Sequence, residues 1–411
     1  MYKMKFVLLF VSAICFSQQS YSLQDCELAF KQNNLELLAQ EYNINQAEAD
    51  IIQAKIWDLP QLGFTTNLYH PQPSQFFNVG PSKNIELTQL FLLGGKRQMR
   101  IDLAKSNKEL AKLQYQQWLV DLNFRLKESF YSLYFDHLKL NGLEKQLVYL
   151  QDLLKAYKLQ TAKGNIALKD EVRLSSMVMA LTEDLVQLKK NISEEQNVLK
   201  TLTGFQDEII PQMLSDEQDQ LRKEPMFSLE EIQRKALENN ADYLSGLLLV
   251  NNSQLNEKYQ KSLNIPDLTG GLQWNQNSGY FKNEINFTLS IPLPLWRQNE
   301  GNVQKAKFQT LQSQKIQGQK KRTLENQIAS AYQQWQLQYQ QFKNISATDL
   351  DNLEMVYKGM TDNFRKGNVT LLEFTDFAES YKQSILQINE IKKQLLIATQ
   401  EINRLVQTPI F

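Results

Sequence analysis

Two long proline-free stretches constrain this chain more than any other feature. No proline lies between Pro81 and Pro211, and none lies between Pro294 and Pro409. A proline inside a helix costs about 3 kcal/mol, so each gap can hold a helix of unusual length. The 411 residues include only 15 glycines and 10 prolines, and few such residues mean few turns. A compact α/β enzyme, which needs a turn after every short element, is therefore disfavoured.

The charges of the chain are balanced, with 45 Lys and Arg against 45 Asp and Glu. A nucleic-acid-binding protein needs a basic surface, so nucleic acid is not an expected partner. The mean hydropathy of −0.45 is typical of a soluble or water-lined protein.

The first residues have the pattern of a secretory signal. Two lysines precede an apolar run over Phe6–Phe16, and small residues follow it. The run is too short to span a bilayer. We therefore expect residues 1–22 to be a signal peptide that is removed after Ser22, with Ser20 at the −3 position. Cleavage after Ser17 is the alternative.

The cysteines add little to this picture. A lipoprotein cysteine at Cys15 is disfavoured, because bulky Ile14 precedes it where a small residue is needed. Cys26 is then the only cysteine of the mature chain, so no intrachain disulfide is expected. No later stretch has 18 consecutive apolar residues, which leaves no further candidate for a membrane-spanning helix. If the protein crosses a membrane, it must do so as β-strands.

The mature sequence repeats itself once. Four landmarks recur in the same order. Three of them recur at an offset of 206 residues: residues 23–34 match 229–240, residues 59–62 match 265–268, and Gly95 matches Gly301. The fourth recurs at an offset of 203 residues, where Lys163–Ile166 matches Lys366–Val369. This pattern predicts an internal duplication. We expect repeat 1 over residues 23–204, a linker over 205–227 and repeat 2 over 228–411.

Each repeat is predicted to contain three helices, the first of which ends before Pro60 or Pro266. They are Gln24–Trp57, Gly95–Gln160 and Leu168–Leu202 in repeat 1, and Leu229–Leu263, Gly301–Phe364 and Thr370–Val406 in repeat 2. Leucines spaced alternately three and four apart indicate coiled-coil packing, and His137 lies on this seam as a packed residue. At roughly 1.5 Å per residue, the summed length of the two short helices of a repeat equals the length of its long helix. We expect them to stack end to end beside it, with strands at one end and tight turns at the other.

Short stretches of alternating residues lie between the first and second helices and indicate β-strands, with loops over His70–Lys83 and Gln276–Lys282. In repeat 2 one face of these strands carries Leu272, Trp274, Ile285, Phe287, Leu289 and Ile291. A soluble half-buried hairpin and a membrane hairpin with this face toward lipid explain the alternation equally well.

At this point the sequence resembles the TolC-type outer-membrane efflux proteins over nearly all of its mature length. The resemblance rests on the repeated opening segment, on Gly94–Ala104 and Ile291–Gly301, and on the two Lys-Gly-Asn turns. Gly-Gly-Lys-Arg at 94–97 and Pro-Leu-Pro-Leu at 292–295 are most similar to the branch that serves heavy-metal (cobalt–zinc–cadmium type) exporters.

The resemblance implies a mainly α fold with a small β part. In a homotrimer, four strands from each chain would form a twelve-stranded transmembrane β-barrel in the outer membrane of a Gram-negative bacterium. The helices would form a long coiled α-helical barrel in the periplasm. The implied function is the passive exit duct of a tripartite efflux system. Its partners would be a periplasmic adaptor protein, an inner-membrane pump of the resistance–nodulation–division type and outer-membrane lipid. The alternative is a periplasmic coiled-coil scaffold or adaptor without a pore.

The resemblance also assigns roles to residues at the helical turns. The residues that match an adaptor-docking tip are Gly164, Asn165, Ile166, Gly367, Asn368 and Val369. Asp170, Glu373 and Asp376 match constricting acidic residues of a periplasmic gate, where converging carboxylates would attract cations. Ile166 and Val369 stand where some relatives have a pairing arginine, so the sequence leaves open whether salt bridges latch the gate. The plain alternative is helix capping, since glycine ends helices and acidic residues favour a first turn.

Thirteen glutamines over residues 304–341 suit either a pore lining or an ordinary solvated helix face. The chain contains no Gly-x-Ser-x-Gly, His-Glu-x-x-His or Walker motif. An enzyme is therefore not expected, and neither a cofactor nor a metal site is predicted. The sequence leaves the transported substrate open.

Overall fold

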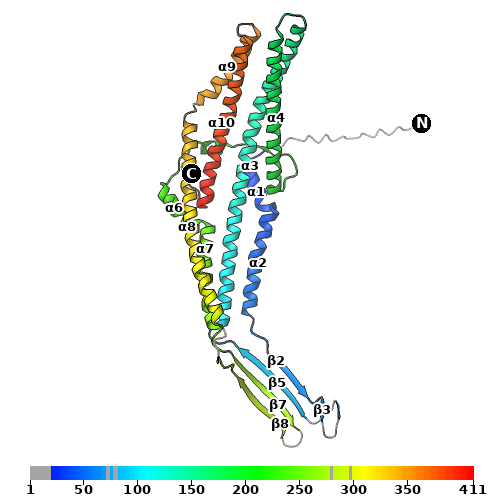
Figure 1. The fold of residues 1–411 in the computed structure, drawn as a ribbon, viewed down its shortest axis with the longest axis vertical. Helices are drawn as coiled ribbons and strands as arrows, with labels where there is room; N and C mark the ends of the chain where they lie inside the picture. Colours follow the sequence, from blue (N-terminus) through cyan, green and yellow to red (C-terminus); the bar gives the residue numbers. More distant parts are fainter. Residues whose placement is uncertain (1–19, 71–74, 77–81, 278–280, 296–298, 346) are drawn as a thin grey trace, which may run out of the picture.

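The computed structural model describes residues 20–70, 75–76, 82–277, 281–295, 299–345 and 347–411. The molecule is long and narrow (Figure 1), with helices along its length, a β-sheet at one end and two helical turns at the other. This is the order that the sequence predicts. The expected signal peptide, residues 1–22, lies almost wholly outside the described residues.

The helices of the first half pack along one long helix. α1 (Leu23–Asn33) and α2 (Leu35–Lys55) lead to the sheet, α3 (Lys96–Ala162) leads back from it, and α4 (Leu168–Thr203) returns beside α3. With 67 residues, α3 is roughly 100 Å long. α2 lies along the sheet end of α3 and α4 along its tip end (Figure 1). The expected stacking of two shorter segments beside one long helix is therefore present.

The second half has the same order of elements. α6 (Leu229–Asn239) and α7 (Ala241–Ser262) lead to the sheet, α8 (Glu300–Lys343) and α9 (Ala347–Arg365) lead to the tip, and α10 (Leu371–Val406) returns. Both α7 and α10 pack against α3, so α3 joins the two halves.

The prediction of one continuous opening helix in each repeat is wrong. Each opening helix breaks at an asparagine, Asn34 or Asn240, whose backbone is extended with ψ of 107° or 115°. The Asn34 side chain accepts a hydrogen bond from the backbone N–H of Leu37, and that of Asn240 accepts one from Tyr243. Asparagine is among the strongest N-cap residues because its side chain competes with the helical backbone. A new helix therefore starts at each asparagine.

The prediction of one continuous helix over Gly301–Phe364 is also wrong. α8 ends at Lys343 and α9 begins at Ala347. The sequence over residues 344–349 is rich in Asn, Ser, Thr and Asp, which have low helix propensity. The interruption therefore needs no proline.

Four strands form one antiparallel sheet in the order β2–β5–β7–β8. They are β2 (Gln61–Thr66), β5 (Ser82–Phe91), β7 (Leu268–Asn277) and β8 (Phe281–Ser290). Each half supplies one hairpin, and pairing of β5 with β7 joins them. The expected loop after β2 also contains a small antiparallel pair, β3 (Tyr69–His70) with β4 (Gln75–Phe76).

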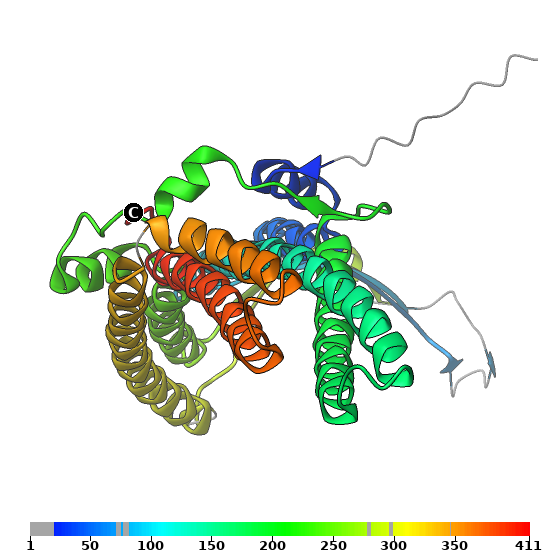
Figure 2. The same cartoon turned by 90° about the horizontal axis from the view of Figure 1, so that it is seen from above.

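The segment between the halves has a structure of its own. β6 (Ile210–Pro211) pairs in parallel with β1 (Ser20–Tyr21), and α5 (Ser215–Gln220) follows. Seen along the long axis (Figure 2), this segment and α1 lie on one side of the row of helices.

The core is a seam between helices rather than one globular centre. Its fully buried side chains include Leu126, Phe130, Leu133 and Leu150 of α3, Leu174 and Leu199 of α4, and Phe374 and Leu396 of α10. His137 is half-buried on this seam. Burial lowers the pKa of its imidazole, which favours the neutral form at pH 7.

Candidate functional site

The sheet has one apolar and one polar face. Residues that pair directly across antiparallel strands point to the same side of a sheet. The apolar rows are Leu62, Leu87, Leu272 and Phe287, then Phe64, Ile85, Trp274 and Ile285. The polar rows are Gly63, Glu86, Gln273 and Asn286, then Thr65, Asn84, Asn275 and Glu284. The separation is therefore consistent across all four strands.

The apolar face is strongly exposed in the single chain. Ile285 is 74% exposed and Phe287 is 72% exposed. A contiguous apolar surface of this kind marks contact with lipid or with another protein. The structure places the predicted surface residues Leu272, Trp274, Ile285, Phe287 and Leu289 on this face, while Ile291 follows the last residue of β8. Trp274 differs from the others in being half-buried.

A buried ion pair fixes the junction between the helices and the sheet. Lys96 Nζ lies 2.6 Å from Asp267 Oδ1 and 2.6 Å from the backbone oxygen of Ile265. The same Asp267 oxygen accepts a hydrogen bond from the N–H of Leu93. Gly94 has a φ of +67°, and a Cβ there would lie 2.7 Å from Ile265 Cδ1. The sequence marks Gly94 only as part of the segment that carries the family resemblance, and it does not predict this role.

Both tips are built as the same turn. Gly164 and Gly367 each have a φ of +76°, a left-handed conformation that glycine adopts without strain. The N–H of the next residue bonds to the oxygen five residues earlier, Asn165 to Gln160 and Asn368 to Asn363, at 3.0 Å in both. This is the Schellman ending of a helix. The glycines and asparagines are exposed, whereas Ile166 and Val369 are half-buried.

The three predicted gate carboxylates have different surroundings. Asp170 is half-buried in the first turn of α4. The pKa of the Tyr157 hydroxyl is raised by the burial of Tyr157 itself and by the negative charge of Asp170. The Glu373 carboxylate accepts hydrogen bonds from the N–H and the hydroxyl of Thr370, both at 2.8 Å. These bonds lower the pKa of Glu373, so its carboxylate caps α10. Asp376 is exposed one turn further along α10.

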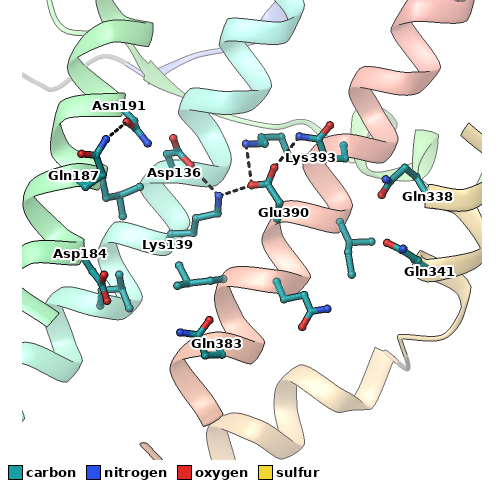
Figure 3. A pocket seen from close by; sticks show the side chains of 16 residues that line it. Asp136, Lys139, Asp184, Gln187, Asn191, Gln338, Gln341, Gln383, Glu390 and Lys393 are labelled. Carbon is teal, nitrogen blue, oxygen red and sulfur yellow. Dashed lines mark hydrogen bonds and ion pairs between the residues drawn. The ribbon is translucent and has the colours of Figure 1, made fainter. Parts of the chain in front are cut away.

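A polar crevice of about 700 Å³ lies among α3, α4, α8 and α10 (Figure 3). The α10 residues that line it include Gln383, Gln387, Glu390 and Gln394. Their spacing of three or four residues places them on one helical face. Asp376 precedes Gln383 by seven residues and therefore belongs to the same polar stripe. Gln338 and Gln341, from the glutamine-rich part of α8, also line the crevice.

Two lysines connect the helical hairpins beside this crevice. Lys139 Nζ of α3 lies 2.8 Å from Glu390 of α10 and 3.0 Å from Asp136 (Figure 3). The second pair has its lysine on the other hairpin: Lys382 Nζ of α10 lies 2.9 Å from Asp184 of α4. Both lysines are only 7% exposed. Because an unpaired buried charge is strongly disfavoured, these pairs constrain how the two hairpins meet.

The charges of this network stabilise one another. Burial alone would raise the pKa of Glu390, but hydrogen bonds from Lys139, Gln394 and Lys393 outweigh burial and lower the pKa to about 2. Burial alone would lower the pKa of Lys139, but its bonds to the two carboxylates raise it overall. Sequence analysis missed this network. Its only sequence signal is the pair of charges at Asp136 and Lys139, beside the apolar seam of α3.

Within the part of the chain that the structure describes, no helix combines the length and the apolar character needed to cross a bilayer. Nor does that part contain a group of three or more His, Cys, Asp or Glu side chains placed to hold a metal ion.

The family model described as "Outer membrane efflux protein" matches residues 29–205 and 232–406. The chain belongs to the outer membrane efflux protein family. A curated relative, the cobalt-zinc-cadmium resistance protein CzcC of Cupriavidus metallidurans, is 22% identical over 374 residues, covering 91% of this chain and 87% of the relative.

Solved structures of membrane channels have the same fold. The CusC structure superimposes with a TM-score of 0.74 at 16% identity, covering 93% of this chain and 91% of that chain. The Campylobacter jejuni CmeC outer membrane channel gives a TM-score of 0.76 at 14% identity, covering 93% and 85%. Coverage above nine-tenths of this chain means that the helices and the sheet both belong to the shared fold.

Family membership decides between the functions that the sequence left open. The protein is an outer-membrane efflux channel of a tripartite system and not an enzyme. It is located at the outer membrane of a Gram-negative bacterium with its helical part in the periplasm, and it works with an adaptor and an inner-membrane pump. The resemblance to TolC-type proteins is confirmed, and a pore-free scaffold or adaptor is not supported.

Proposed function

We propose that three copies of the chain close into one duct, with a twelve-stranded transmembrane β-barrel continued by an α-helical barrel. The observation that carries this proposal is the two-faced sheet. β2 and β8 are the outer strands of the four, so each offers an edge with which another strand can pair. Pairing β8 of one copy with β2 of the next removes these edges. It also turns the apolar face toward lipid and the polar face toward water.

In this duct the polar stripe of α10 faces the water-filled interior. The stripe from Asp376 to Gln394 joins a predicted gate residue to the crevice that glutamines and paired charges line. Uncharged amides suit a pore through which solutes must pass without tight binding. Three copies of Asp170, Glu373 and Asp376 gather near the tip, where like charges attract cations and repel anions.

The two exposed tip turns are the docking points for the periplasmic adaptor. Both present the same Schellman geometry, so one adaptor motif can engage both hairpins of a chain. We assign the pump to the resistance–nodulation–division type and the cargo to metal cations. The support is the similarity to CzcC together with the Gly-Gly-Lys-Arg and Pro-Leu-Pro-Leu segments.

We also propose that the two halves arose by duplication, as residues 23–204 and 228–411 joined by the segment 205–227. The recurrence of the same helices and strands supports this division, and so does the double match of the family model.

The test is to purify the protein from membranes in detergent, to measure the mass of the intact assembly and to record its single-channel currents in planar bilayers. We expect the mass of three chains and discrete, cation-selective conductance steps. A monomer recovered from a periplasmic extract without detergent, or a trimer with no conductance, would contradict the proposal. Measuring the sensitivity of a deletion strain to cobalt, zinc and cadmium tests the cargo separately. Unchanged tolerance of all three metals would refute the metal assignment alone.

A further inference from the structure

Residues that the sequence pattern assigns to the signal peptide are part of the fold. Ser20 and Tyr21 form β1 and pair with Ile210 and Pro211. The backbone oxygen of Tyr21 accepts a hydrogen bond from the N–H of Gln212 at 2.8 Å. The Ser20 hydroxyl donates one to the Gln212 side-chain oxygen at 2.9 Å. These contacts attach the start of the described chain to the segment between the halves.

The next contacts extend this attachment into α1. The Tyr21 ring stacks on Phe205, with ring centroids 4.6 Å apart and planes at 30°. Ser22 is the N-cap of α1, and its hydroxyl accepts a hydrogen bond from the N–H of Asp25. The Asp25 carboxylate in turn accepts one from the N–H of Ser22 at 2.9 Å. Ser22 and Asp25 thus form a capping box, which needs the residue before α1 to be present.

Cleavage after Ser22 would remove all of these contacts. It would also leave a new α-amino group on Leu23, the first residue of α1. A positive charge at the N-terminus of a helix opposes the helix dipole.

We infer that the mature protein keeps Ser20–Ser22, and that signal peptidase hydrolyses the bond between Ser17 and Gln18. Water adds across this peptide bond, which leaves a carboxylate on Ser17 and an amino group on Gln18. Signal peptidase needs small residues at the −1 and −3 positions after an apolar run. Upstream of Ser20, Ser17 at −1 and Cys15 at −3 are both small, and Ser17 directly follows the apolar run that ends at Phe16.

The first test determines the N-terminus of the full-length protein isolated from membranes, by Edman sequencing and intact mass. We expect the chain to begin at Gln18. A chain that begins at Leu23 would overturn the inference, as would a lipid-modified Cys15 or an uncut Met1. None of these outcomes bears on whether the protein conducts ions, so this test is independent of the proposed duct.

The second test blocks cleavage with a bulky residue at each candidate −1 position. Processing occurs during export, so an immunoblot of whole cells for precursor and mature chain does not require a correctly folded product. We expect Ser17→Tyr to accumulate precursor. In its matched control, Ser22→Tyr, the ratio of mature chain to precursor should be at least about ten times higher. Any other pattern, including normal processing of both variants, would overturn the inference.

Discussion

The side-chain amide of Asn34 donates a hydrogen bond to the backbone oxygen of Leu202, 3.1 Å away. Asn240 makes the same bond to Leu405 in the second half, at 3.0 Å. Both asparagines are buried, and both also cap the helix that follows them. Each therefore starts one helix and satisfies a carbonyl at the end of another, which would otherwise have no partner.

Asn34→Ala should lower the free energy of unfolding by about 1–3 kcal/mol, because it removes an N-cap and a buried hydrogen bond together. Asn240→Ala should cost a similar amount. The measurement is thermal unfolding of the purified protein in detergent. Asn34→Ser should lose less, because its hydroxyl can still cap Leu37 although it no longer donates to the oxygen of Leu202. Asn43→Ala, on the exposed side of α2, is the control and should stay within about 0.5 kcal/mol. An unaltered unfolding temperature for both alanine variants of the buried asparagines would contradict this role.

Acid should weaken the contact between the two helical hairpins. The folded-state pKa of Glu390 is about 2, below its usual 4.5. A lowered pKa gives stability that is complete above pH 4.5 and is lost as the pH falls toward 2. The Glu390 side chain is 41% exposed, so solvent screening limits the loss to about 1 kcal/mol. Stability measured from pH 6 to pH 2 should fall less in Glu390→Gln than in the unmodified protein. Glu194→Gln, on the exposed face of α4, should retain the full acid dependence.

Phe287→Lys should prevent stable insertion, because it places a charge on the apolar face of the sheet. The expected cost is about 2–4 kcal/mol if the side chain lies near the middle of the bilayer. Asn286→Lys changes the neighbouring residue on the polar face and serves as the matched control. The readout is the amount of assembled protein in outer-membrane fractions on semi-native gels. Equal amounts of the two variants would mean that the apolar face does not contact lipid.

Of the predicted gate carboxylates, Asp376 should act on ion conduction and Glu373 mainly on the stability of α10. Replacing Glu373 and Asp376 together by Ala should raise single-channel conductance and weaken cation selectivity. We expect Asp376→Ala to account for most of the electrical change with an unaltered unfolding temperature. Glu373→Ala should instead remove a helix cap, at about 0.5–2 kcal/mol. Wild-type conductance and selectivity in the double variant would remove both residues from the gate.

The tip glycines should be intolerant of a side chain for reasons of backbone strain alone. Nothing lies within 4 Å of a Cβ placed on Gly164 or Gly367, but both have a φ of +76°. Alanine at either position should cost about 1–2 kcal/mol. Gly359→Ala, inside α9 and equally free of contacts, should instead stabilise by about 0.5–1 kcal/mol. Thermal unfolding compares them, and equal shifts at positions 164 and 359 would refute the strain argument.

Most of what the sequence did not predict depends on contacts between distant residues; the interruption between α8 and α9, which residues 344–349 account for locally, is the exception. The capping preference of asparagine is also local, but by itself it does not show that Asn34 and Asn240 break their helices. Their second bonds reach carbonyls 168 and 165 residues away. The Lys139–Glu390 pair spans 251 residues. Such contacts depend on how helices meet, and heptad spacing gives no information about that.

The sequence by itself determined the extent of α3, α4 and α10, the alternating strands and the glycine turns. These features depend on near neighbours: proline excludes helix, period two defines a strand face, and a positive φ selects glycine. Only the tertiary structure decided the breaks at the asparagines, the Lys96–Asp267 junction and the reciprocal lysine pairs between hairpins. It also decided that Ser20 and Tyr21 belong to the fold, because the partners of these two residues lie almost two hundred positions further along the chain.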